Sequence, residues 1–95
     1  MARYISLLKF TEQGAKAIKK STARAREFNA AAAKAGVKIE GEYWTVGPFD
    51  GMLILSGPNE QAVLRAVADL GALGNVRTQT LQAFNEQEFE AIVGK

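Results

Sequence analysis

The sequence predicts an α+β domain with the ferredoxin-like order β-α-β-β-α-β, in which a four-stranded antiparallel sheet carries two helices and a short C-terminal helix follows. Three observations predict this fold. Four short segments are apolar or alternating, as in strands; two segments between them carry an apolar stripe at helical spacing; and breaks containing Gly, Pro or Asn separate the elements. With 95 residues, we expect residues 1–95 to form a single domain.

The first strand is expected at residues 4–10, a short apolar run that contains one charged side chain, Lys9. A run that is apolar on both sides is typical of a central strand. Thr11 offers a helix N-cap. Small and apolar residues then share one stripe from residue 14 to residue 35, which predicts one long amphipathic helix anchored by Phe28 and ended by Gly36.

The second strand is expected at residues 37–46, with Ile39 and Tyr43 on one face and Trp44 on the other. Gly41 in the middle of this strand indicates a β-bulge or a close backbone approach. Because Tyr43 and Trp44 are adjacent, one ring must enter the helix-covered core and the other must face the opposite side of the sheet. The alternation alone does not decide which.

The third strand is expected at residues 52–56, which are apolar on both faces and therefore central. Asn59 is the expected N-cap of the second helix. The fourth strand, residues 76–84, is polar enough to be an edge strand. Asn85 and Glu88 then form the Asn-x-x-Glu pattern of a capping box, which predicts the start of the short C-terminal helix.

Composition limits the chemistry that this chain can perform. It is 47% hydrophobic and 23% charged and has neither Cys nor His. Thiolate catalysis, disulfides and thiolate metal sites are therefore excluded, and the usual general base and the usual zinc and haem ligand are missing. We expect no metal site and no cofactor. Any acid–base chemistry would depend on Asp, Glu, Lys, Tyr or water.

The expected location and partners also follow from composition. No apolar run is long enough to span a bilayer, and the N-terminus shows no signal-peptide pattern, so we expect a cytoplasmic protein without membrane contact. The net charge of +2 is too small to indicate nucleic-acid binding. We interpret Lys16, Lys20 and Arg24, spaced by four residues, as a solvated helix face.

The predicted architecture leaves one face of the sheet uncovered, because two helices cover only the other face. The central strands carry apolar side chains on both faces, so a monomer would expose an apolar patch large enough to call for a partner. The sequence therefore predicts a homodimer or a higher homo-oligomer. The alternative is a monomer whose C-terminal helix folds back across the open face.

Three segments, RYISLLKFTEQG, GEYWTVGPFDGMLIL and LGNVRTQTLQAF, resemble the GYD domain family. These are small bacterial proteins of uncharacterised function, similar in fold to the dimeric α+β barrel proteins. The Gly-Tyr-Asp element that names the family falls at Gly47, Phe49 and Asp50, with Pro48 inserted and Phe in place of Tyr. The phenol hydroxyl is therefore missing here. The haem enzymes of the barrel superfamily depend on a His, which this chain lacks.

Asp50 is the candidate catalytic residue and the side chain around which a pocket is expected. It follows Gly-Pro-Phe, so it is either a pocket carboxylate or a turn residue that accepts backbone N–H bonds. Arg77 on the last strand is either a clamp for a carboxylate or phosphate, or one member of an ion pair. The full set of ligand-binding candidates is Tyr4, Lys9, Trp44, Phe49, Asp50 and Arg77.

Three functions remain open from the sequence. The first is a non-enzymatic, oligomeric small-molecule-binding or assembly protein with a pocket between the sheet and a neighbouring element. The second is a cofactor-free enzyme of the dimeric α+β barrel type, with Asp50 as general base and Arg77 as the clamp. The third is a structural subunit of a larger complex. Whether the protein is an enzyme stays open at this point, with a non-enzymatic role favoured.

Overall fold

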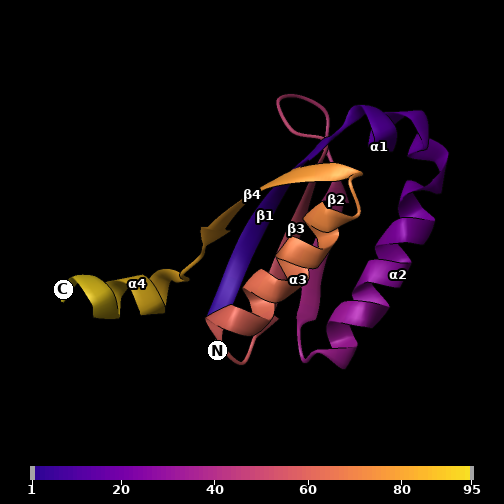
Figure 1. Cartoon of the computed structure of the whole chain (residues 1–95). Coiled ribbons are helices and arrows are strands. Elements are labelled where there is room, and N and C mark those ends of the chain that lie inside the picture. Colours follow the sequence, from indigo (N-terminus) through magenta and orange to yellow (C-terminus); the bar gives the residue numbers. More distant parts are fainter. Residues whose placement is uncertain (1, 95) are drawn as a thin grey trace.

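The computed structural model describes residues 2–94, and its elements are shown in Figure 1. They are β1 (Ala2–Phe10), α1 (Glu12–Lys16), the short 3-10 helix η1 (Ile18–Lys20), α2 (Ser21–Lys34), β2 (Lys38–Trp44), β3 (Gly51–Gly57), α3 (Glu60–Ala72), β4 (Val76–Gln82) and α4 (Glu86–Val93). Within these residues the strands form one sheet in the order β2-β3-β1-β4, and all neighbours are antiparallel. The predicted fold class is confirmed.

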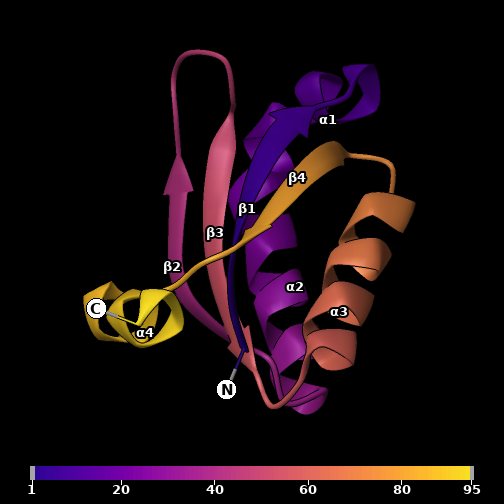
Figure 2. The same cartoon turned by 90° about the vertical axis from the view of Figure 1, so that its left-hand side faces the viewer.

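The molecule has two layers, and the helices α2 and α3 lie together on one face of the sheet (Figure 2). The core lies between these helices and the two central strands. Its buried residues are Tyr4, Phe28, Ala32, Val37, Leu53, Leu55, Val63, Ala66 and Val67. Along β3, Leu53 and Leu55 point into this core, while Met52 and Ile54 point to the opposite face and are only half-buried. That opposite face is called the open face below.

The predicted long helix is broken at Ala17, where φ is −107° and ψ is 30°. The cause is a tertiary contact at the N-terminal end. Thr11 N–H donates to Asn75 O (3.0 Å), and the Thr11 hydroxyl donates to Gly74 O (2.6 Å). These bonds hold α1 against the loop before β4, so the chain has to turn at Ala17 before α2 can lie along the sheet. The expectation of one continuous helix was wrong for this reason.

A β-bulge in β2 decides the orientation of the adjacent aromatic rings. The pairing with β3 shifts between Ile39, opposite Leu55, and Gly41, opposite Ile54. One extra residue reverses the side-chain alternation beyond it. Tyr43 therefore lies on the open face, opposite Met52. The prediction that Tyr43 and Ile39 share a face was wrong, because the bulge lies between them. Trp44 turns toward α2.

The predicted helix starts are confirmed by their hydrogen bonds. Asn59 Oδ1 accepts from Ala62 N–H (2.9 Å) at the start of α3. Asn85 Oδ1 accepts from Glu88 N–H (2.8 Å), and a Glu88 carboxylate oxygen accepts from Asn85 N–H (2.7 Å), which completes the capping box of α4. The strand β4 is an edge strand as predicted, and it ends at Gln82.

Candidate functional site

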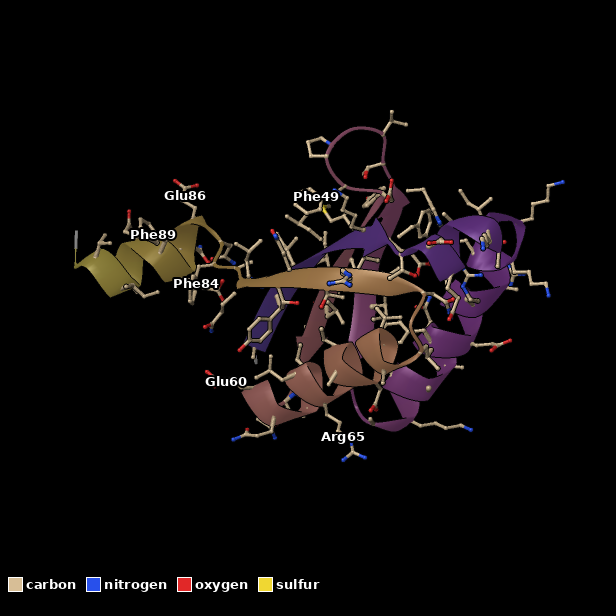
Figure 3. All side chains as sticks on the ribbon, turned by 45° about the horizontal axis from the view of Figure 1, so that its top comes forward. Phe49, Glu60, Arg65, Phe84, Glu86 and Phe89 are labelled. Carbon is tan, nitrogen blue, oxygen red and sulfur yellow. The ribbon has the colours of Figure 1, made fainter. Side chains whose placement is uncertain are left out.

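The structure distributes the six predicted site residues over four places. Trp44 and Asp50 line one cavity on the helix side of the sheet. Lys9 and Arg77 are exposed on the open face, where they lie opposite each other in adjacent strands. Tyr4 is buried in the core. Phe49 lies half-buried at the base of the β2–β3 loop, as Figure 3 shows.

The cavity has a volume of about 70 Å³ and lies between the sheet and the helices α2 and α3. Its walls are mainly apolar and include Leu8, Phe10, Phe28, Leu53, Leu70 and Val76. A space of this size holds several water molecules or a small organic group. The cavity therefore has the apolar character that small-molecule sites share.

Trp44 stands at the end of β2, beside this cavity. Its Nε1–H donates to the hydroxyl of Ser21 at the start of α2 (2.9 Å). The indole is 48% exposed, so it is accessible from solvent as well as from the cavity. The bulge at Gly41 is what turns this ring to the helix side.

Asp50 ties the end of the β2–β3 loop to the end of β1. Its carboxylate Oδ2 accepts from Phe10 N–H (2.8 Å). Its own N–H donates to Leu8 O (2.8 Å), and its carbonyl accepts from Thr45 N–H (3.0 Å). Asp50 therefore combines the two predicted geometries, because it accepts a backbone N–H and also lines the cavity.

Arg24 and Glu42 also line the cavity, and neither is among the predicted site residues. Arg24 Nη1 donates to Ala17 O (2.8 Å), which bends this side chain over the helix break. Glu42 Oε1 accepts from Asn29 Nδ2 (3.3 Å). Arg24 precedes Phe28 by one helical turn, and this spacing is a signal that could have indicated its place beside the buried side of the helix. Arg77 lies on the other face of the sheet, so it does not meet Asp50.

The open face is the second candidate surface. Two cross-strand rows of apolar side chains run across it. The pairings Tyr43–Met52 and Met52–Leu7 define one row, and the pairings Ile54–Ile5 and Ile5–Leu81 define the other. Tyr43 and Leu81, at the flanks, are 57% and 52% exposed. No described helix covers these rows (Figure 2), and the alternative of a C-terminal helix folded back across them is not the arrangement found.

The C-terminal helix α4 projects beyond the sheet (Figure 1). None of its residues is buried. Its visible link to the sheet is the ion pair between Arg3 Nη1 and Glu88 Oε1 (2.7 Å). Two hydrogen bonds lower the pKa of the Glu88 carboxyl. The larger contribution comes from Asn85 N–H and the next from the Arg3 side chain. The hydrogen bond to Glu88 and its negative charge raise the pKa of Arg3.

Tyr4 differs from the other candidates because it is enclosed by the core. It is 7% exposed, and burial, with a smaller contribution from the negative charge of Glu60, raises the pKa of its phenol. A phenol that is held neutral and packed among core side chains is suited to stabilising the fold. Tyr4 is not among the residues that line the cavity.

The described part of the chain contains no helix that is both long and apolar enough to cross a membrane. Residues 2–94 also bring together no group of three or more acidic side chains that could hold a metal ion.

The fold and the two surfaces define a small α+β sandwich protein with an uncovered apolar sheet face and a small apolar cavity. Residues 4–93 match the GYD domain family, and the chain belongs to this family. The resemblance predicted from the sequence is thereby confirmed.

Two similar proteins come from Thermus thermophilus. The first is named glutamine synthetase and cystathionine beta-lyase binding protein, and it is 31% identical over 84 residues, which cover 87% of this chain and 88% of that protein. The second is TTHA0845, whose crystal structure is similar to this one with a TM-score of 0.58 and 21% sequence identity. The superposed region covers 90% of this chain and 95% of that chain. The second similarity supports the fold alone.

Proposed function

We propose that this protein is a single-domain, cytoplasmic binding protein that works as a homo-oligomer and takes other proteins as partners. The observation that carries this proposal is the open face. Ile5, Leu7, Met52 and Ile54 are half-exposed on the two central strands, where a sheet is normally covered. A contiguous apolar patch of this kind marks an interaction site, and packing two such faces together buries both patches.

Enzymes are the proposed class of protein partner. The support is the relative named for its binding to glutamine synthetase and cystathionine beta-lyase, because the similarity extends over most of both chains. In a pair joined through the open faces, the helices α2 and α3 stay on the outside of the assembly. The helical layer is then available for a larger partner.

Native mass spectrometry tests the first part of this proposal. We expect the wild-type protein to appear as a dimer or a larger oligomer, and Leu7→Lys or Ile54→Lys to appear as a monomer, because each places a charge in the buried apolar rows. Leu64→Lys is the matched control, since Leu64 is an exposed apolar residue on α3 (49% exposed), and it should leave the mass unchanged. A monomeric wild-type protein would contradict the proposed oligomer.

The second part is tested by surface plasmon resonance with immobilised protein and purified glutamine synthetase and cystathionine beta-lyase from Thermus thermophilus. We expect saturable binding of at least one enzyme. Neither enzyme binding at tens of micromolar, with the oligomer intact, would overturn the enzyme partner while leaving the oligomer.

A second candidate function is small-molecule binding in the cavity under Trp44. The observation that favours it is an apolar cavity with a few polar side chains at its wall, the usual composition of such sites. The carboxylates of Asp50 and Glu42 favour a cationic ligand, and Arg24 favours an anionic one. The cofactor-free enzyme, with Asp50 as general base, is the catalytic form of the same proposal, and Arg24 is better placed than Arg77 to serve as its clamp.

Fluorescence of Trp44, the only Trp in the chain, tests this candidate. Titration with benzylamine and with benzoate, two small rings of opposite charge, should give a saturable change for one of them. Asp50→Asn should weaken the response to benzylamine several-fold while the fold is kept, because the amide oxygen still accepts from Phe10 N–H. Linear responses to both probes would count against a cavity ligand.

A further inference from the structure

The helix α4 is well capped and yet buries none of its residues against the described chain. Its N-terminus has a complete capping box, and Gly94 adopts the left-handed conformation (φ 74°) at its C-terminus. Phe89, Ile92 and Val93 are all more than half exposed. A helix of this length is marginal in water on its own, so these side chains require a surface to pack against.

The position of α4 indicates where that surface comes from. The helix projects from the side of the open face, away from α2 and α3, and it lies near the end of the sheet where β1 begins (Figures 1 and 2). Phe84 and Phe89 lie along this projecting segment (Figure 3). A second sheet that packs on the open face at the usual spacing of about 10 Å would lie directly beside α4.

The distribution of charge indicates which end of the second sheet lies beside α4. Glu86 and Glu90 give α4 two acidic side chains in addition to the paired Glu88. At the far end of the open face, where β1 ends, Lys9 lies opposite Arg77. Like charges in this arrangement repel, and neither side chain forms an ion pair within residues 2–94. The Lys9–Arg77 pair therefore has no acidic partner within residues 2–94, and Glu86 and Glu90 of α4 carry charges of the sign that it would attract.

A two-fold axis that lies between the two open faces and runs across the strands would bring α4 of one copy to the Lys9–Arg77 pair of the other. It places the start of β1 in one copy over the end of β1 in the other, and it repeats the contact symmetrically. An axis parallel to the strands would instead place α4 beside the partner's own α4 end. Leu7, Met52 and Tyr43 supply apolar surface next to Lys9 and Arg77.

We propose that α4 is an intersubunit arm that binds a second copy of this chain at the Lys9–Arg77 end of its open face. Phe89, Ile92 and Val93 pack on the apolar rows, while Glu86 and Glu90 pair with Lys9 and Arg77. This proposal rests on the open-face association proposed above. It adds the identity of the segment that holds the two copies in one orientation.

Cross-linking of engineered cysteines tests the contact, because the chain has no Cys of its own. Chains that carry only Glu90→Cys are mixed and equilibrated with chains that carry only Lys9→Cys, and a short bismaleimide is added. We expect a covalent pair that contains one chain of each kind. As a matched control, Glu27→Cys on the exposed side of α2 replaces Glu90→Cys and should yield no covalent pair with Lys9→Cys.

A charge-reversal series gives an independent readout from the dimer dissociation constant. Lys9→Glu with Arg77→Glu should raise this constant about tenfold, since two pairs are lost at each of two symmetric sites. Adding Glu86→Lys and Glu90→Lys should restore it. A dimer in native mass spectra that neither cross-links nor shows this restoration would overturn the arm and leave the open-face association standing. A monomer would overturn both.

Discussion

At the residue scale, the closest constraint in the structure is the approach of Gly14 to the backbone of Asn75. A Cβ at position 14 would overlap the carbonyl oxygen of Asn75 and come within 2.9 Å of its carbonyl carbon. Both atoms belong to the backbone, so no side-chain rotation can relieve the contact. The approach also lets Thr11 and Asn75 form their hydrogen bond.

We predict that Gly14→Ala destabilises the fold by about 1–3 kcal/mol, the usual cost of overpacking. Gly71→Ala is the matched control, because a Cβ at Gly71 meets nothing within 4 Å and the residue lies inside α3. This control should stabilise the fold by about 0.5–1 kcal/mol through lower backbone entropy in the unfolded chain. Urea unfolding followed by circular dichroism measures both changes. Equal midpoints for the two variants would contradict the interpretation.

Among the candidate residues, the sequence predicted the position of the β2–β3 loop, but it did not predict which side chains line the cavity beside it. The Gly-Pro-Phe-Asp segment was selected for its turn chemistry, and Asp50 does lie at the cavity. Arg77 was grouped with Asp50 although the two lie on opposite faces of the sheet. The four-residue spacing of Lys16, Lys20 and Arg24 predicted a solvated helix face, yet the Arg24 side chain bends over the helix break and lines the cavity.

At the element scale, what could be predicted depended on local signals. The strands, the N-caps Thr11 and Asn59 and the capping box of α4 were predictable, because each depends on residues a few positions apart. The break at Ala17 was not, since it depends on bonds between α1 and the distant loop that contains Asn75. Periodicity along one segment carries no information about such contacts.

The bulge in β2 has a larger consequence for the site than for the fold. Gly41 indicated a bulge or a close backbone approach, and the bulge is the one that is found. The atoms nearest to a Cβ at this position would be side-chain atoms, the first of them Ile54 Cδ1 at 3.0 Å. A shift of one residue moves every later side chain to the other face. Trp44 therefore reaches the cavity and Tyr43 the open face, an outcome that depends on the register with β3.

At the scale of the whole molecule, the described chain is a two-layer sandwich from which α4 projects, with extents of 48 × 31 × 17 Å. Only one face of its sheet contributes to a core. A chain of this size buries little more than about 60% of its unfolded surface, so covering the open face would add a large share of the total stabilisation. Folding and association are then expected to be coupled.

This coupling predicts that the thermal midpoint rises with protein concentration, because the proposed native state is a dimer and the unfolded state is not. Two chains of this length together have an unfolding enthalpy of about 130 kcal/mol, so each tenfold increase in protein concentration should raise the thermal midpoint by about 4 °C. Ile54→Lys, which removes the association, should melt at a lower temperature that does not change with concentration. Scanning calorimetry from micromolar to millimolar protein measures both. Wild-type transitions that superimpose over this range would show that the open face is stable without a partner.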